Sequence, residues 1–157
     1  MIGSILDKIK HYCAYQERCH SEVEQKLFDL GCTSYAETGA YTAALIEENY
    51  LNEERFARAF ARGKFRIKGW GKKRIVLELK QRKVSDYCIK AGLSEIDETE
   101  YLHVLHTLTE KKWAEYRKEA NDWKRSSKTR DALLRKGFEN DLVSEALKLV
   151  KQTGDTD

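Results

Sequence analysis

The feature of this sequence that most restricts its fold is a motif that occurs three times. The copies occupy residues 23–32, 75–84 and 129–138, and each has a leucine at its fifth position: Leu27, Leu79 and Leu133. These leucines lie at nearly equal separations along the chain. Such spacing is typical of tandem structural units that bury their faces against one another. The pattern therefore predicts an array of similar units.

The composition indicates that these units are helical. The 157 residues include no proline and only nine glycines, so few positions interrupt a helix. Residues that favour helix, such as Ala, Leu, Glu, Lys, Arg and Gln, are abundant. We therefore expect an all-α fold of three-helix units, with about two and two-thirds repeats.

Capping patterns place the helices of the first part of the chain. Ser21 and Glu24 form a predicted capping box, and Gly31 suits the end of that helix. A second helix is expected over residues 35–48. Asn52 then caps a third helix, whose first turn contains two glutamates.

Later helices follow from the same signals. Ser85 begins a short helix to about Ala91, and residues 94–97 open a long helix that continues past Trp113. Residues 119–127 are predicted to form a polar linker anchored by Trp123. Two final helices end near Val150, and residues 153–157 are expected to fray. The predicted units are 1–67 with an N-terminal extension, 68–118 with a basic start, and 119–157 as a shortened third unit.

Charge is strongly segregated along the chain. Residues 55–83 contain twelve Lys or Arg and a single acid, Glu78, whereas residues 1–54 contain four Lys or Arg and ten acids. A basic segment of this density indicates an anionic partner. The alternative is a solvated basic face that pairs with the acidic flanks.

Within the basic segment, one helix is predicted to separate charge from core. Four arginines fall on one face: Arg55, Arg58, Arg62 and Arg66. A separate stripe is expected to face the core: Phe56, Phe60, Gly63 and Ile67. Phe65 points back toward the basic side in this arrangement, either at an interface or against a neighbouring helix.

Two glycines around Trp70 then break the helix and predict a flexible connection. The next helix opens with three cations, which oppose the positive end of the helix dipole. This placement fits a surface that meets phosphates or a carboxylate-rich protein. The predicted binding residues are Arg55, Arg58, Arg62, Lys64, Arg66, Lys68, Trp70, Lys72, Lys73 and Arg74.

Catalytic and metal-binding motifs are not evident. Cys13, Cys19 and His20 lie close in sequence, but we interpret the cysteines as reduced thiols on or under helices. His103 and His106 are three residues apart, without an organised carboxylate or cysteine nearby. The sequence shows no phosphate-binding loop, GxSxG or HExxH motif. We therefore expect no catalysis, no cofactor and no metal.

No run of apolar residues is long enough to span a membrane, and residues 1–10 lack the apolar core of a secretory signal. We expect a cytoplasmic protein.

The run Tyr50-Leu51-Asn52-Glu53-Glu54-Arg55-Phe56-Ala57-Arg58-Ala59-Phe60 resembles the RecX family, as do residues 64–71 with Arg74-Ile75 and Glu78-Leu79. Arg18, Ser21, Leu27 and Gly31 match the first unit of the family, and residues 133–138 match its last. The likeness covers about Tyr12 to Val150. One departure is Lys83, where the middle unit of the family usually ends in glycine.

The resemblance implies an elongated, curved array of three-helix units. It implies a protein that lies in the groove of RecA filaments on single- or double-stranded DNA and inhibits filament growth, strand exchange and ATP hydrolysis. These roles belong to homologous recombination, DNA repair and the SOS response. We expect a monomer that does not bind membranes. The alternative is a helical nucleic-acid-binding module without specificity for a recombinase.

Overall fold

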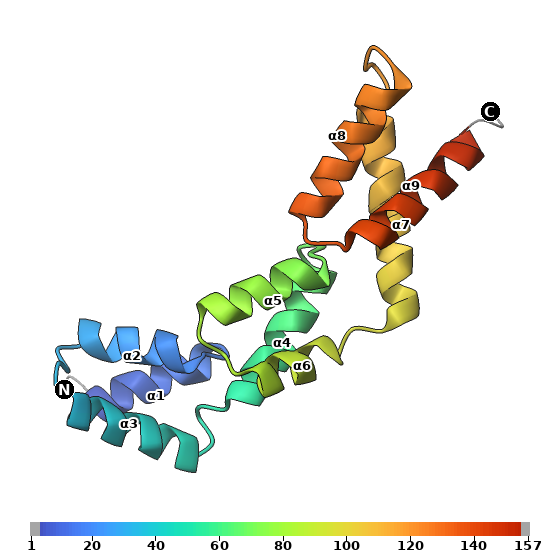
Figure 1. The fold of residues 1–157 in the computed structure, drawn as a ribbon. Coiled ribbons are helices and arrows are strands. Elements are labelled where there is room, and N and C mark those ends of the chain that lie inside the picture. The colour runs from blue at the N-terminus through green and yellow to red at the C-terminus, as the bar shows by residue number, and fades with distance from the viewer. Residues whose placement is uncertain (1–3, 155–157) are drawn as a thin grey trace. The chain divides into compact units, whose positions relative to one another are not determined.

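The computed structural model describes residues 4–154, and this range contains helices and no strand (Figure 1). The all-α prediction is confirmed. No helix within the described range is long and apolar enough to cross a membrane. The helices are α1 Ile5–Tyr15, α2 His20–Asp29, α3 Tyr35–Glu47, α4 Glu53–Arg66, α5 Lys72–Gln81, α6 Asp86–Leu93, α7 Glu98–Glu115, α8 Asp122–Arg135 and α9 Asn140–Gly154.

The chain divides into two compact units that are not continuous in sequence. The first unit comprises Met1–Ala61 and Glu78–Glu95, and the second comprises Arg62–Leu77 and Ile96–Asp157. Helices α1, α2, α3 and α6 therefore belong to the first unit, and α7, α8 and α9 belong to the second. Helices α4 and α5 each contribute residues to both.

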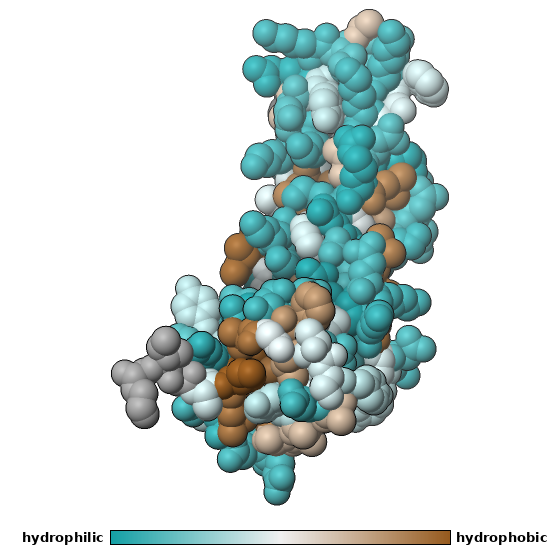
Figure 2. All heavy atoms as spheres, turned by 90° about the vertical axis from the view of Figure 1, so that its left-hand side faces the viewer, coloured by the Kyte–Doolittle hydropathy of each residue, from teal (hydrophilic) through white to brown (hydrophobic). Residues whose placement is uncertain are grey.

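The core of the first unit forms where α2 packs against α1 and α3. Its fully buried apolar side chains come from all three helices and the loop after α3: Ile9, Val23, Leu27, Leu45 and Leu51. Some large apolar side chains stay on the surface, such as Phe28 and Tyr35. Figure 2 shows hydrophobic residues gathered over the part of the chain formed by α1–α3.

The repeated motif folds in the same way each time, as the second helix of a group of three. Leu27, Leu79 and Leu133 are completely buried. The carbonyl of each leucine accepts a hydrogen bond from the N–H five residues later, at 2.9, 3.1 and 3.3 Å respectively. The residue directly before the one that donates this N–H has positive φ in every copy: Gly31, Lys83 and Gly137. These contacts define the Schellman motif that ends α2, α5 and α8.

Lys83 adopts a backbone conformation that suits glycine. Its φ is 61°, in the left-handed region where a Cβ is unfavourable. We expect Lys83→Gly to raise the free energy of unfolding by about 1 kcal/mol, measured by urea denaturation. Lys80→Gly, a change inside the last turn of α5, should instead lower it by roughly 0.5–1 kcal/mol. An unchanged or lowered stability of Lys83→Gly contradicts this account of the helix end.

The second unit is built on the mutual packing of α7, α8 and α9. Trp113, Leu147 and Val150 form one buried cluster. A second group of aromatic rings centres on Tyr101, whose ring centroid lies 5.6 Å from that of Phe65 and 5.2 Å from that of Phe138. This aromatic group joins the end of α4 to α7 and to the loop between α8 and α9.

The predicted stripe on α4 was partly wrong. Phe65 is buried against Tyr101 of α7, in agreement with the alternative of contact with a neighbouring helix, whereas Ile67 is 81% exposed rather than in the core. The reason is that Ala57 and Ala61 are completely buried and shift the buried face. At Ala57 the neighbouring helix α6 comes so close that a Cβ on Gly92 would lie 2.7 Å from the Ala57 carbonyl oxygen.

The predicted capping box was also misplaced. Helix α2 begins at His20, and Glu22 accepts a hydrogen bond from the backbone N–H of Cys19 at 3.1 Å. Ser21 instead donates to the carbonyl of Arg82 at 3.1 Å and so satisfies a polar group at the end of α5. The serine links two elements of the first unit rather than starting a helix.

The end of the chain is more helical than predicted. Residues 122–127 belong to α8, with Asn121 as its N-cap, so the polar linker is limited to the residues before them. Trp123 is 76% exposed and does not anchor the segment. Thr153 and Gly154 continue α9 rather than fray, and residues 155–157 lie outside the described range.

Candidate functional site

The ten predicted binding residues are divided between the two units. Arg55 and Arg58 belong to the first unit. The other eight belong to the second: Arg62, Lys64, Arg66, Lys68, Trp70, Lys72, Lys73 and Arg74. The two groups have different surroundings, so each is considered separately.

Arg55 makes several hydrogen bonds within the first unit. Its Nε lies 2.6 Å from Oε1 of Glu17, and its Nη1 donates to Oδ1 of Asn49 at 3.0 Å. Nη2 donates to the carbonyl of Asn49 at 3.1 Å. The guanidinium thus connects the loop after α1 with the loop before α4. The positive charge of Arg55 is therefore paired with a carboxylate of its own unit.

Arg58 is also paired with carboxylates of its own unit. Its Nη1 lies 3.2 Å from Oε1 of Glu95, and its Nε lies 3.6 Å from Oε2 of Glu54. The hydrogen bond with Glu95 raises the pKa of the Arg58 guanidinium. For Arg55 and Arg58, the structure favours the alternative reading in which basic residues pair with the acidic flanks.

In the second unit, two further cations have carboxylate partners. Arg66 Nε lies 3.6 Å from Oε1 of Glu100, and Lys72 Nζ pairs with Glu98. Both pairs are at the surface, where such contacts contribute little to stability. Arg62 lies half-buried on α4.

Trp70 gathers two of the predicted cations around its indole ring. Lys64 Nζ lies 5.0 Å from the ring centroid, and Arg74 Cζ lies 4.1 Å from it. Both distances fit cation–π interactions. The ring therefore holds an ammonium and a guanidinium close together, on the last turn of α4 and the first turn of α5.

The connection around Trp70 is fixed rather than flexible, contrary to the prediction. The N–H of Gly71 donates to the carbonyl of Lys136 at 2.7 Å, and the N–H of Lys73 donates to the carbonyl of Gly137 at 3.0 Å. A Cβ on Gly71 would lie 2.3 Å from the carbonyl carbon of Gly137. Gly71 is thus required for close contact between two backbones, not for freedom of the chain.

The start of α5 is held from a third side by Tyr101. Its hydroxyl accepts a hydrogen bond from the N–H of Lys72 at 2.9 Å and donates one to Glu139. Burial and the bond to Glu139 raise the pKa of the Tyr101 phenol well above its ordinary value. The hydroxyl satisfies one of the free N–H groups of the first turn. The three cations of that turn are therefore presented on a rigid support.

Further cations from α7 and from the end of α8 lie near the first turn of α5. Burial lowers the pKa of Lys136, and the nearby charges of Lys112, Arg74 and Lys111 lower it further. Lys136 Nζ donates to the carbonyl of Lys68 at 3.2 Å. We call Lys68, Lys73, Arg74, Lys111, Lys112 and Lys136 the basic cluster. Lys112 also pairs with Glu115 at 3.1 Å.

Sequence reasoning missed Lys111, Lys112 and Lys136. They lie far from residues 68–74 in the sequence, and contacts such as the hydrogen bonds at Gly71 and Lys73 bring the segments together. The available signal was Gly137, since a helix that ends in a left-handed glycine fixes where the next residues go.

The cysteines and histidines show no sign of a metal centre. All four cysteines are buried free thiols. Burial raises the pKa of Cys13 and of Cys19, which makes these thiols less reactive. His106 Nε2 lies 2.7 Å from Glu110, and His103 is exposed. Within residues 4–154, no group of three or more His, Cys, Asp or Glu is placed to hold a metal ion.

Comparison with known families identifies two consecutive three-helix domains in the chain. Residues 52–93 match the model of the second three-helix domain of RecX, and residues 98–147 match that of its third three-helix domain. Together these matches cover more than half of the chain. The chain belongs to the RecX family. Helices α4–α6 thus form the second three-helix domain of the family, and α7–α9 form the third.

Curated relatives agree with this assignment. The chain is 27% identical over 146 residues to the regulatory protein RecX of Bacillus cytotoxicus, covering 92% of this chain and 53% of the relative. It is 35% identical over 91 residues to the regulatory protein RecX of Lactobacillus johnsonii, covering 58% of this chain and 33% of the relative. The chain therefore spans between a third and about half of these relatives.

Solved RecX structures share the fold. The crystal structure of RecX from Lactobacillus salivarius matches with a TM-score of 0.82 at 23% identity, over 94% of this chain and 95% of that one. A second crystal structure of a regulatory protein RecX matches with a TM-score of 0.81 at 20% identity, over 92% of this chain and 70% of that one. The tandem helical repeats expected from sequence are confirmed.

The matched RecX domains begin one helix earlier than the predicted units do. The predicted boundaries at 67/68 and 118/119 fall after α4 and after α7, whereas the matched domains begin with these helices. The difference arises because the repeated leucine motif lies in the second helix of each domain, not in the first.

Proposed function

We propose that this protein regulates RecA recombinase by binding in the groove of RecA–DNA filaments, where it limits filament growth, strand exchange and ATP hydrolysis. Membership of a family whose relatives are named regulatory proteins supports a regulator. The specific partner follows from the resemblance described above. We further propose that the protein acts in the cytoplasm as a monomer and uses neither a cofactor nor catalysis.

The basic cluster is the observation that carries this proposal. Burial, together with the like charges of Lys112, Arg74 and Lys111, lowers the pKa of half-buried Lys136 and so disfavours its charged form in the free protein. The adjoining α5 has no acid in its first turn, against the preference of the helix dipole. An anionic partner would relieve both costs, so the cluster fits binding to a negatively charged surface such as DNA phosphates.

We propose that the residues that contact the filament are those of the second unit. The basic cluster, together with Lys64 and Trp70, is our candidate for the filament contact. Arg55 and Arg58 are assigned to internal support because carboxylates of the first unit engage them. Arg62 and Arg66 lie on α4 and Lys72 lies on α5, next in sequence to Lys73 of the cluster, and we include them in the candidate surface.

Tandem domains offer a physical route to regulation. Each domain contributes a modest contact, and joined contacts bind more strongly than either does alone. A protein that bridges neighbouring RecA protomers can only bias filament states that differ in their affinity for it. Inhibition follows when the preferred filament geometry is poor for strand exchange or for growth at the end.

The proposal is tested by adding the protein to the RecA of its host during ATP hydrolysis on single-stranded DNA. We expect the rate to fall progressively as the protein is titrated, with a matching loss of strand exchange. An ATPase rate that stays unchanged at excess protein contradicts the proposal.

The second candidate function is a helical nucleic-acid-binding module without recombinase specificity. The same basic cluster favours it, since a surface built for phosphates binds naked DNA as well. Its affinity should fall steeply with salt because neutralised phosphates release counterions. Inhibition that disappears when DNA is in large excess over protein would favour this candidate, since the protein would then act by occupying DNA.

A further inference from the structure

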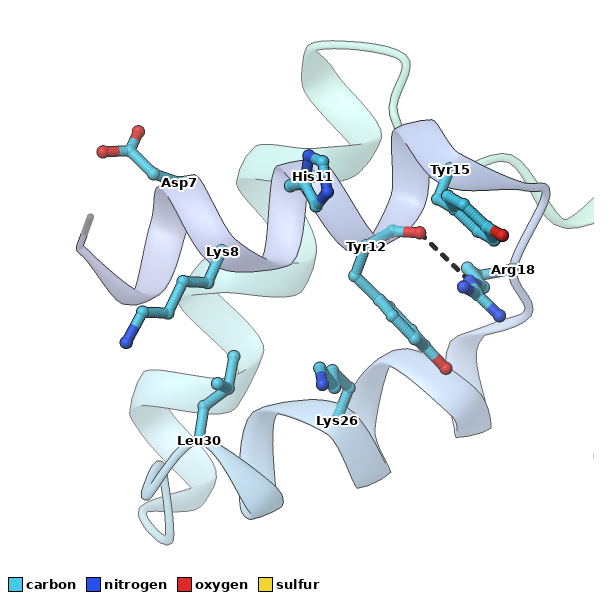
Figure 3. Close-up of a pocket in the computed structure, with 8 residues that line it drawn as sticks. All are labelled: Asp7, Lys8, His11, Tyr12, Tyr15, Arg18, Lys26 and Leu30. Carbon is cyan, nitrogen blue, oxygen red and sulfur yellow. Dashed lines mark hydrogen bonds between the residues drawn. The ribbon is translucent and has the colours of Figure 1, made fainter. Parts of the chain in front are cut away.

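A groove between α1 and α2 of the first unit has features that the proposed function does not use (Figure 3). Its volume is about 460 Å³, within the range of about 300–1,000 Å³ that holds small ligands. Lys8, Tyr12 and Tyr15 line it from the side of α1, and Lys26 lines it from α2. Arg18, in the loop between these helices, closes one end.

The groove concentrates the positive charge of an acidic part of the chain. Residues 1–54 contain only four Lys or Arg, and three of these line the groove: Lys8, Arg18 and Lys26. Of the ten acids in the same range, one, Asp7, lines it. On an ordinary solvated surface of this part of the chain, the ten acids would be mixed with the four cations, whereas the groove collects the cations.

These three cations also lack carboxylate partners. In the part of the chain that the structure describes, no ion pair involves Lys8, Arg18 or Lys26. The fourth cation, Lys10, lies outside the groove and pairs with Glu48 at 2.7 Å. The lining of the groove therefore has an excess of positive charge, although acids are abundant in residues 1–54.

Arg18 is positioned in advance for an anion. Its Cζ lies 3.7 Å from the centroid of the Tyr12 ring, and its Nε donates to the carbonyl of Tyr12 at 3.0 Å. These contacts fix the plane of the guanidinium while its terminal amino groups have no acceptor among residues 4–154. Lys26 Nζ lies on the same ring, 5.4 Å from its centroid. A planar fork held in this way suits a phosphate group.

The rim of the groove supplies aromatic surface. Tyr15 is 78% exposed, and His11 is also exposed beside it on α1. Exposed rings next to cations are typical of sites for single-stranded nucleic acid, in which bases stack and phosphates pair with charge. An acidic peptide would use the cations but not the rings. A duplex keeps its bases stacked internally, and the acidic surroundings oppose the approach of a long polyanion.

We propose that this groove binds a short single-stranded stretch of nucleic acid, with a base stacked on Tyr15 and the adjoining phosphates on Lys8, Arg18 and Lys26. The site lies in a different unit from the basic cluster and goes beyond the proposed function. It gives the first unit a contact that depends on unpaired bases, whereas the basic cluster requires only negative charge.

The test is photocrosslinking of a short thymidine oligonucleotide that carries one 5-iododeoxyuridine. Crosslinks are mapped by mass spectrometry of the digested full-length protein. We expect crosslinks within residues 8–30, centred on Tyr15. Tyr15→Ala should reduce their yield about tenfold at sub-saturating oligonucleotide, the effect of losing one stacked base. Lys8→Gln with Lys26→Gln should reduce it to a similar degree.

Two matched variants control for general effects. Tyr35→Ala removes an equally exposed tyrosine of the same unit outside the groove, and Lys10→Gln removes the remaining cation of residues 1–54. Both should leave the yield unchanged. Lys68→Glu with Lys73→Glu, in the basic cluster, should also leave the crosslinks at Tyr15 in place, so this proposal and the proposed function fail independently.

Two results overturn the proposal. One is a set of crosslinks confined to residues 62–77 and 96–154. The other is competition in which a glutamate-rich peptide displaces the oligonucleotide from residues 8–30 as efficiently as unlabelled oligothymidine does, which would assign the groove to an acidic peptide.

Discussion

Replacing Gly71 with alanine is expected to lower the free energy of unfolding by roughly 3 kcal/mol, measured by urea denaturation. The added Cβ would lie 2.3 Å from both the carbonyl carbon of Gly137 and the amide nitrogen of Phe138. These neighbours are backbone atoms, which cannot move aside like the end of a side chain. Relief of the clash would stretch the hydrogen bonds from Gly71 and Lys73 to residues 136 and 137.

The matched control is Gly39→Ala. Gly39 lies within α3, and a Cβ there meets nothing within 4 Å. Because alanine favours helix over glycine, this change should raise stability by roughly 0.5–1 kcal/mol. If Gly71→Ala is as stable as the wild type, the close contact at the start of α5 is not as described, and the support of the basic cluster is lost with it.

The double variant Lys68→Glu with Lys73→Glu is expected to weaken inhibition of RecA ATP hydrolysis by at least tenfold. Both side chains are exposed, and neither has a side-chain partner in the described part of the chain, so the helical CD spectrum should not change. Reversal of two charges removes attraction to phosphates and adds repulsion. The slope of log affinity against log salt should also become shallower by about 2.

The control for this variant is Lys80→Glu with Lys90→Glu. These lysines are also exposed, and they belong to the first unit rather than to the basic cluster. The total change in charge is the same, so a general electrostatic effect would weaken both variants alike. Full inhibition by the Lys68 and Lys73 variant, or an equal loss in both, contradicts the assignment of the cluster.

Local sequence signals predicted many elements of the fold, although they did not place a helix at Ile5–Tyr15. Ser85 and Asn52 cap α6 and α4 as expected, because their side chains accept hydrogen bonds from N–H groups three residues later. The repeated leucines were recognised because burial and a left-handed helix end occur at fixed positions in each motif. Patterns of this kind involve only neighbouring residues.

The candidate site depended on contacts that neighbouring residues do not reveal. Arg55 was predicted on a basic ridge, but Glu17, distant in sequence, engages it. The cluster around Lys136 arises because Gly71 and Gly137 let two backbones meet. Ala57 was not recognised as core because a small side chain gives little hydrophobic signal, although it marks where α6 approaches α4.

Recognition of a coated filament rather than of bare DNA is tested most directly by comparing two affinities. Fluorescence anisotropy would measure binding of the protein to a labelled single-stranded oligonucleotide, naked or saturated with RecA, at about physiological ionic strength. A regulator of filaments binds the RecA-coated strand at least tenfold more tightly. Equal affinities, or tighter binding to the naked strand, would leave a nucleic-acid-binding protein with no preference for its proposed partner.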